Sequence, residues 1–312
     1  MSDAATFSAG TLVSALVHGA ALIFLFSAFG ALLFLTVVGA PAIALMEPRE
    51  QARAERRSAH LAAWSLALGA LWEIAWLVVE SAVLAGAGLA ALPAAVAVVA
   101  SHTEFGHLVL AQVAFLVCGL VVLGKKRNGV SVRLAAALSG IAVLLEAWHL
   151  HAAAMDPKPS FFLACEALHV LAAAAWLGSL LPLALLIRAA PPKVGLAAAL
   201  RYSAFAKPAV VALMVTAAFQ GLVLVGSIPA FFTTAYGRVV VVKIVLFAIL
   251  IGFALRHRFR MVPALADADR GAMRRHLGRS VFAETGFGVA IVVVAAVLAS
   301  LAPPTMAAMA MH

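Results

Sequence analysis

Charged residues are scarce in this chain. Asp, Glu, Lys and Arg make up 11% of the 312 residues, whereas a soluble domain carries roughly 25%. Apolar residues account for 65%, and the mean hydropathy is +1.09. A globule with so few polar side chains cannot cover its whole exterior with them, so its outer surface must face lipid. The composition therefore excludes a water-soluble fold and predicts an integral membrane protein.

Cysteine is nearly absent as well. The two present, Cys118 and Cys165, lie in separate apolar stretches, which excludes a disulfide framework and a Cys-x-x-Cys metal motif. No Lys or Arg precedes Arg49, so the N-terminus lacks the cationic region of a cleaved signal peptide. We therefore expect the first apolar stretch to stay in the protein as a membrane span.

Long apolar stretches are what the chain has in abundance. An α-helix needs roughly 20 apolar residues to cross about 30 Å of hydrocarbon, and its backbone amides must be satisfied within the helix because lipid offers no partners. Eight stretches fit, near residues 11–40, 60–86, 105–123, 133–152, 161–187, 208–228, 238–256 and 281–301. The stretch 88–103 is too short for a ninth span, and we expect an interfacial segment there. The predicted fold class is an all-α polytopic membrane helix bundle with about eight transmembrane helices.

Basic residues gather on every second connection between these spans. Most of the 22 Lys and Arg residues lie within 49–57, 125–133, 188–207 and 256–279. The positive-inside rule assigns such connections to the cytoplasm, which predicts that both termini are periplasmic. The net charge of +9 is then a signal of topology, and we expect no nucleic-acid partner.

Ionisable side chains inside the spans are few and therefore informative. A charge at the bilayer centre costs about 2.5–3.5 kcal/mol on insertion scales, so such groups face a cavity or a partner. The carboxylates of this kind are Glu73, Glu80, Glu146, Glu166 and Glu284. Most of the ten histidines fall on the outer half of the protein, among them His18, His102, His107, His149, His151 and His169. This asymmetry predicts a functional site near the outer leaflet.

A carboxylate and an imidazole recur at the same spacing in two neighbouring spans. Glu146 and His149 lie three residues apart in the fourth span, and Glu166 and His169 do so in the fifth, so each pair shares a helix face. A short connection joins these spans, so we expect antiparallel neighbours whose pairs converge. Histidine is the commonest metal ligand, and a carboxylate beside it fixes its tautomer.

The pattern therefore predicts a transition-metal site near the outer surface. The candidate metal ligands are His149, His151, His169, His102, His107, Glu146, Glu166, Glu80, Glu73 and Met155. Met155 and Cys165 add soft sulfur of the kind that Cu(I) prefers. The C-terminal Met306, Met309, Met311 and His312 form either a second copper-capturing segment or a frayed end.

The same residues fit two other interpretations. Glu-x-x-His helices also occur in di-iron bundles, and histidines from different spans ligate haem b, so a membrane oxidoreductase or electron carrier is the alternative function. The polar groups also suit an assembly protein in which they only hold helices together. No serine lies in a nucleophile context, which favours a transporter or metal-binding protein over an enzyme.

From the fifth span onward, the chain resembles the copper resistance protein D (CopD) family of bacterial inner-membrane proteins. The residues that carry the resemblance are His169, the Ala-Trp-Leu-Gly run of 175–178, Pro182, Arg201-Tyr202-Ser203, Ala206, Gly221, Thr234-Ala235-Tyr236-Gly237-Arg238, Lys243, Arg274-Arg275, Glu284 and Pro303-Pro304. The N-terminal half resembles the family only in its pattern of spans. We therefore expect a four-span N-terminal half, 1–160, and a CopD-like four-span half, 161–312, in one membrane domain.

The resemblance implies a multi-pass inner-membrane protein that moves copper, as Cu(I) or Cu(II), from the periplasm toward the cytoplasm. It also implies a periplasmic copper carrier of the CopC type as a partner, and we expect no CopC-like domain fused to either end. It does not imply a ligand set. Of the candidate ligands, His169 alone also belongs to the matched series.

Lys243 and Arg238 stand near the outer end of the seventh span, where positive charge would repel a copper ion. We expect them to pair with glutamates or to anchor the helix at the headgroups. Glu284, in the eighth span, is expected to be a helix–helix hydrogen-bonding partner or a countercharge of Arg279 or Lys243.

Overall fold

The structure, a computed structural model, describes residues 9–86, 89–125, 128–149, 160–261 and 270–309. Within these ranges every regular element is a helix. Eight helical segments are long and apolar enough to cross a membrane: Ala9–Ile43, Pro48–Ala85, Glu104–Lys125, Gly129–His149, Ser160–Ala189, Pro192–Val225, Ala235–Phe259 and His276–Met306. The predicted all-α bundle with eight spans is confirmed.

The first half of the chain supplies four of these spans. Its elements are α1 (Ala9–Phe34), η1 (Leu35–Gly39), α2 (Ala40–Ile43), α3 (Pro48–Ala85), η2 (Leu89–Ala91), α4 (Leu92–His102), α5 (Glu104–Lys125), α6 (Gly129–Leu145) and η3 (Glu146–His149). The helix α4 has 11 residues, so the stretch 88–103 adds no ninth span, as expected.

The second half supplies the other four. Its elements are α8 (Ser160–Leu177), α9 (Leu180–Ala189), α10 (Pro192–Val225), α11 (Ala230–Thr233), α12 (Ala235–Arg256), η4 (His257–Met261), α14 (Arg270–Ala299) and α15 (Pro304–Met309). The helices α8 and α9 together form one span.

Two helices begin well before the spans predicted for them. The helix α3 begins at Pro48 and α10 at Pro192, whereas the apolar stretches begin near 60 and 208. The additional turns carry basic residues, so apolarity alone does not reveal that the helix continues. Pro208 lies inside α10 instead of starting it; membrane helices tolerate such prolines because neighbouring groups re-satisfy the freed backbone.

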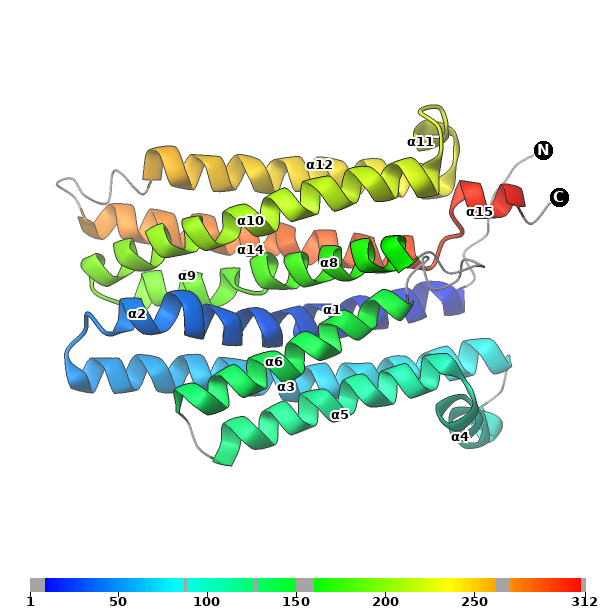
Figure 1. The fold of residues 1–312 in the computed structure, drawn as a ribbon, viewed down its shortest axis with the longest axis horizontal. Coiled ribbons are helices and arrows are strands. Elements are labelled where there is room, and N and C mark those ends of the chain that lie inside the picture. Colours follow the sequence, from blue (N-terminus) through cyan, green and yellow to red (C-terminus); the bar gives the residue numbers. More distant parts are fainter. Residues whose placement is uncertain (1–8, 87–88, 126–127, 150–159, 262–269, 310–312) are drawn as a thin grey trace.

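The first helix lies at the centre of the bundle. In Figure 1, α1 runs between α3, α5 and α6 on one side and the second half of the chain on the other. It packs against α3, α6, α8 and α14. By contrast, α12 lies at the edge of the bundle, and little of its span is buried within the protein. The central helix therefore joins the two halves, and side chains on it can face both.

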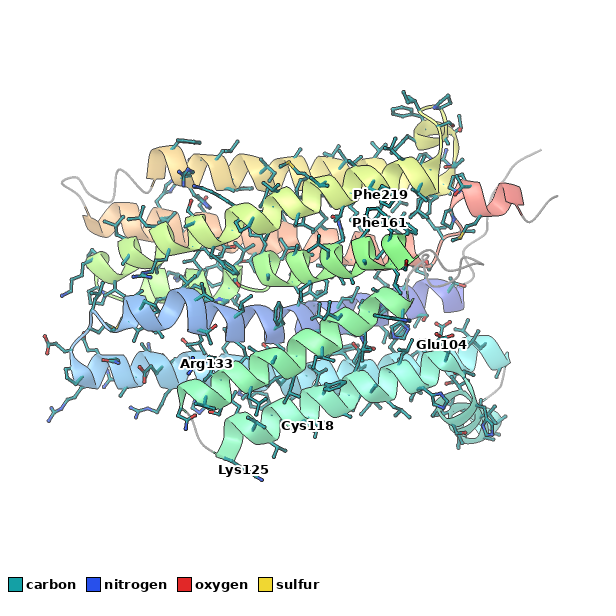
Figure 2. The ribbon with its side chains drawn as sticks, viewed as in Figure 1. Glu104, Cys118, Lys125, Arg133, Phe161 and Phe219 are labelled. Carbon is teal, nitrogen blue, oxygen red and sulfur yellow. The ribbon has the colours of Figure 1, made fainter. Side chains whose placement is uncertain are left out.

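The basic connections lie at one end of the bundle. The α2–α3, α5–α6 and α9–α10 connections lie toward the same end, and both ends of the described chain lie at the other (Figure 1). Lys125 and Arg133 flank the α5–α6 connection, whereas Glu104 marks the opposite end of α5 (Figure 2). The charge separation along the bundle axis follows the alternation seen in the sequence.

Two glycines allow the halves to approach closely. A Cβ atom added to Gly178 would lie 1.9 Å from the carbonyl oxygen of Phe26, and one added to Gly30 would lie 2.3 Å from the carbonyl carbon of Gly178. The hydroxyl of Ser179 donates to the carbonyl oxygen of Gly30 over 2.9 Å. Small residues at a helix crossing permit such backbone contact in membranes. This contact fixes α1 against the α8–α9 junction.

The connection between the second and third spans has the same design in both halves. The helices α3 and α10 end at the left-handed Gly86 (φ 55°) and Gly226 (φ 76°), and a short helix, α4 or α11, follows each. Glycine adopts this conformation without steric penalty.

The long helix after each short one begins at a threonine cap. Thr103 and Thr234 each donate to a carbonyl oxygen of the short helix over 2.7 Å. Each also accepts a hydrogen bond from a glycine amide, Gly106 or Gly237, over 3.0 Å. The turn between the second and third spans is therefore built in the same way in both halves.

Candidate metal-handling site

Four polar side chains of the N-terminal half form one hydrogen-bonded chain. His18 of α1 contacts a carboxylate oxygen of Glu146 through Nε2 at 2.8 Å, and the amide of Gln112 in α5 donates to the other carboxylate oxygen at 3.2 Å. The side-chain oxygen of Gln112 lies 3.1 Å from Nε2 of His149. His18, Gln112 and Glu146 are buried. Three helical segments thus place two imidazoles around one carboxylate within the membrane span.

The partners of this chain fix both imidazole tautomers. A carboxylate accepts, so His18 donates from Nε2 to Glu146. The amide nitrogen of Gln112 donates to Glu146 and to the carbonyl oxygen of Ala142, so its oxygen accepts from Nε2 of His149. In the neutral imidazoles this arrangement leaves Nδ1 of each ring as the atom with an available lone pair.

Aromatic rings enclose the two histidines. The ring of His18 stacks on Trp76 of α3, with centroids 3.8 Å apart and an interplanar angle of 9°. His149 meets the same indole edge-on at 5.0 Å and Phe105 at 5.4 Å. These ring contacts pack against both imidazoles and help to hold the hydrogen-bonded chain in place.

Two further carboxylates lie on α3. Glu80 accepts a hydrogen bond from the hydroxyl of Ser14 in α1. Glu73 lies two turns deeper along the helix and is fully buried, and neither of its carboxylate oxygens has a hydrogen-bond partner among the described residues. The charges of Glu73 and Glu146 interact. A buried carboxylate without a partner is costly, so Glu73 stays a candidate site residue.

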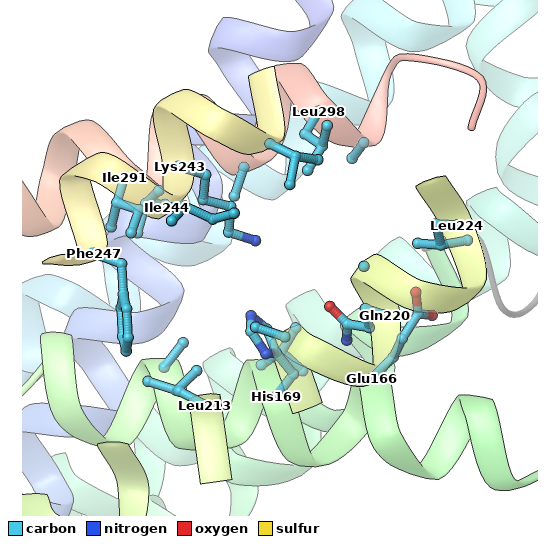
Figure 3. A pocket seen from close by; sticks show the side chains of 18 of the residues that line it. Glu166, His169, Leu213, Gln220, Leu224, Lys243, Ile244, Phe247, Ile291 and Leu298 are labelled. Carbon is cyan, nitrogen blue, oxygen red and sulfur yellow. The ribbon is translucent and has the colours of Figure 1, made fainter. Parts of the chain in front are cut away.

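The second Glu-x-x-His pair lines a cavity of about 440 Å³ in the C-terminal half. Glu166 and His169 of α8 lie on one side of it, and Lys243 of α12 points into it from the other (Figure 3). Glu166 interacts electrostatically with Lys243. The expectation that Lys243 pairs with a glutamate is consistent with this arrangement. His18 and Glu146 also line the cavity, so the two polar regions share a wall.

The ring of His169 is held by Thr216 of α10. Nδ1 of His169 lies 2.8 Å from the hydroxyl of Thr216, which in turn donates to the carbonyl oxygen of Ala212 over 2.6 Å. When Nδ1 of His169 donates this bond, Nε2 is left as an acceptor, and when the hydroxyl donates it, Nε2 carries the hydrogen.

The remaining candidate ligands lie apart from both groups. His102 and His107 are exposed at the α4–α5 turn, where they contact the hydroxyl and the carbonyl oxygen of Ser101. His151 and Met155 lie outside the described residues, as do Met311 and His312 of the C-terminal segment. Over the part of the chain that the structure describes, no three His, Cys, Asp or Glu side chains are grouped as metal ligands.

Glu284 has a partner that the sequence did not suggest. Its carboxylate lies 3.1 Å from Nδ1 of His257, at the start of η4, and the other nitrogen of His257 lies 2.8 Å from the hydroxyl of Ser280. This contact bears out the expectation that Glu284 is a helix–helix hydrogen-bonding partner, and it is made with His257 instead of Arg279 or Lys243. Helix α12 must reach the level of Glu284 for this contact to form, which depends on how α12 and α14 are aligned.

Three central residues were not among the predicted ligands. His18 stands alone in its span with no carboxylate at helical spacing, and Gln112 and Trp76 are not metal ligands. The position of Gln112, a polar residue within an otherwise apolar stretch, is the one signal that the sequence offered for it. Its role as a bridge depends on the packing of α5 against α6.

The fold and the buried polar groups define a multi-pass membrane protein. The model of the family described as "Copper resistance protein D-like, N-terminal domain" matches residues 1–159, half of the chain, and the model described as "Copper resistance protein D" matches residues 196–298. The chain therefore belongs to the copper resistance protein D family, whose members are inner-membrane proteins. The expectation that the N-terminal half shares only a pattern of spans with the family is wrong, because that half carries the longer match.

Two curated relatives support the assignment. The copper transport protein CutJ of Bacillus subtilis is 28% identical over 166 residues, which cover 52% of this chain and 29% of CutJ. The inner membrane protein YebZ of Escherichia coli is 30% identical over 142 residues, 44% of this chain and 48% of YebZ. Each match thus spans less than half of the relative's length. No solved structure matches the chain.

Proposed function

We propose that this protein carries copper ions across the inner membrane, from the periplasm toward the cytoplasm, through the buried polar groups of its N-terminal half. The observation that carries the proposal is the hydrogen-bonded chain of His18, Glu146, Gln112 and His149. A carboxylate that holds an imidazole in one tautomer raises its basicity as a metal ligand. Because the chain belongs to a copper resistance family, we assign this buried arrangement of imidazoles and a carboxylate to the binding of the transported copper ion.

The route follows from the order of these groups along the helices. Copper is delivered by a periplasmic carrier of the CopC type to the outer end, where His102 and His107 are exposed. The ion is then held by Nδ1 of His149 and of His18. Glu80 and Glu73 on α3 compensate its charge further inward, since a cation in a low-dielectric environment needs an opposite charge nearby.

The pair Glu166 and His169 plays a different part in this proposal. Both face Lys243 across the cavity (Figure 3), and a fixed positive charge opposite them disfavours a second cation there. The copper site is therefore placed in the N-terminal half, where the bridging residue is the neutral Gln112.

A volume-conserving substitution tests the proposed site. Glu146→Gln removes the negative charge beside His18 while keeping the shape of the side chain and one acceptor oxygen. We expect copper affinity to fall about 10- to 100-fold, as for other groups that orient metal-bound histidines. The measurement is equilibrium copper binding to purified protein, together with copper uptake into vesicles that contain it.

Ser139→Ala is the matched control, because the hydroxyl of Ser139 is buried on α6 and donates only to carbonyl oxygens of its own helix. We expect unchanged binding in this variant. Equal copper affinity in wild type and in Glu146→Gln would remove the site, and vesicles that bind copper without taking it up would reduce the role to storage.

A further inference from the structure

The repeated turn allows positions in the two halves to be matched one to one. Nine residues after Thr103 comes Gln112, and nine residues after Thr234 comes Lys243. In the same way, Phe105 corresponds to Tyr236. These pairs occupy the third span of each half, at the same distance from the threonine cap.

The glycines that end α3 and α10 give a second match. Trp76 lies ten residues before Gly86, and Thr216 lies ten residues before Gly226. Each contacts the histidine on the first helix of its half: Trp76 stacks on His18, and Thr216 bonds to His169. One match counts forward from the threonine caps and the other counts back from the glycines. Both lead to the surroundings of the histidine on the first helix of each half.

This environment is filled in one half and hollow in the other. In the N-terminal half, the indole of Trp76 lies flat on His18, and Phe105 closes the space at 4.9 Å from the indole. In the C-terminal half a threonine replaces the tryptophan, and the cavity of about 440 Å³ opens beside His169. Thr216 itself does not line this cavity, but His169, to which it bonds, does. The space therefore lies beside the histidine whose counterpart in the other half is covered by an indole.

We propose that this cavity binds a lipid-soluble molecule with a planar ring head and an apolar tail, of the quinone class. The ring takes the place against His169 that the indole of Trp76 has against His18. Carbonyl oxygens on the ring accept hydrogen bonds from the amine of Lys243 and the amide of Gln220, which both point into the cavity (Figure 3). Nε2 of His169 accepts from a quinol hydroxyl or donates to a quinone carbonyl, according to which partner donates in the bond to Thr216.

The remaining walls fit an apolar tail. They are formed by aliphatic and aromatic side chains, including Leu213, Phe247, Ile291 and Leu298 (Figure 3). A mostly apolar pocket with a few convergent polar groups is typical of small-molecule sites. A metal ion alone would not fill a cavity of about 440 Å³ whose walls are mostly apolar.

The cavity opens toward the bilayer. Three of its lining residues also lie on the outer surface of α10 and α12: Leu222, Met214 and Ile244, which are 78%, 47% and 53% exposed. These positions are inside membrane spans, so the rim faces lipid. A ligand that dissolves in the bilayer can therefore enter between α10 and α12 without crossing water.

The test is the binding of decylubiquinone, a quinone with a short tail, to purified full-length protein by titration calorimetry in detergent. We expect saturable binding of one molecule per chain. Thr216→Trp puts an indole against the ring of His169, which lines the cavity, and removes the hydroxyl that holds that ring. We expect it to abolish binding. Val215→Trp is the matched control, because Val215 is the adjacent residue and is 64% exposed on the lipid face.

Lys243→Met serves as a second variant that preserves side-chain volume, so a folding defect in Thr216→Trp does not decide the matter. We expect about tenfold weaker binding in Lys243→Met, the loss typical of a hydrogen bond from a charged donor. Copper binding is measured in the same samples. The two proposed sites share a wall formed by His18 and Glu146, but they bind different ligands, so each binding measurement tests one proposal.

Three results would overturn the proposal. One is the absence of saturable decylubiquinone binding to the wild type, or equal binding in Thr216→Trp. Another is equally tight binding of decanoate that displaces decylubiquinone, since the occupant would then be an anionic lipid. The third is a Soret band in the purified protein, which would assign the space to haem.

Discussion

Glu73 carries a carboxylate that the fold does not satisfy. It is completely buried in α3, and both of its oxygens lack a hydrogen-bond partner among the described side chains and backbone groups. An unsatisfied buried polar group destabilises a protein by about 1–3 kcal/mol. Proteins retain such groups where function requires them, and here the proposed copper route offers the reason.

The effect of removing this carboxylate should have opposite signs for stability and for function. We expect Glu73→Met to raise the thermal unfolding temperature, because the unsatisfied group is replaced by an apolar side chain of similar length, and to abolish copper uptake into vesicles. Glu284→Met is the contrasting variant. Glu284 is equally buried but paired with His257, so its loss should lower the unfolding temperature. If Glu73→Met were destabilised like Glu284→Met, the carboxylate would have a structural role.

The sequence identified the ionisable residues at this scale but not their partners. Glu73, Glu80, Glu146 and Glu166 stood out because charge is rare in apolar stretches. Their hydrogen bonds depend on how α1, α3, α5 and α6 are rotated about their axes, which the pattern of a nearly all-apolar helix does not encode. His18 became a member of the site only because α1 lies at the centre.

At the scale of elements, the contact between α1 and the α8–α9 junction depends on two glycines. Gly178→Ala would place a methyl group 1.9 Å from the carbonyl oxygen of Phe26, so the helices must separate. Forcing extra methyl groups into a packed core typically costs about 1–3 kcal/mol. We expect a clearly lower unfolding temperature and reduced yield of monodisperse protein, measured by size-exclusion chromatography after heating.

Gly252→Ala supplies the control for that substitution. Gly252 lies in α12, and a methyl group added there has no atom within 4 Å. The same chemical change should therefore leave the unfolding temperature unchanged or slightly raised, since alanine favours a helix over glycine by about 1 kcal/mol. Equal losses in the two variants would mean that the glycine contact contributes nothing specific.

The helices themselves were predictable, but their ends were not. Apolar length located all eight spans, because the bilayer imposes that length on any helix that crosses it. The first turns of α3 and α10 are outside that constraint. These turns contain basic, partly exposed residues, so a criterion based on apolar length predicts a loop there. The helix nevertheless continues through them.

For the whole molecule, the orientation in the membrane stays a prediction from the distribution of charge. A C-terminal fusion to alkaline phosphatase should be active, because that enzyme requires the periplasm, whereas a fusion in the α5–α6 connection after Lys125 should be inactive. The reverse pattern would invert the bundle and with it the proposed direction of copper movement. Equal activities at both points would contradict a single orientation.

The two halves have the same order of four spans and the same turn after the second span, which limits how an ion could cross the membrane. A unit with an even number of spans returns to the side on which it began, so its copy enters the membrane in the same orientation. The repeat is therefore parallel, and the α4 and α11 turns lie at the same end (Figure 1). Transporters built from inverted repeats exchange outward-open and inward-open shapes by letting the two repeats trade conformations. Halves that face the same way are related by an axis along the membrane normal, so any alternation between outward-open and inward-open shapes would come from rocking of one half against the other. The central helix α1, which packs against both halves, would lie at the pivot.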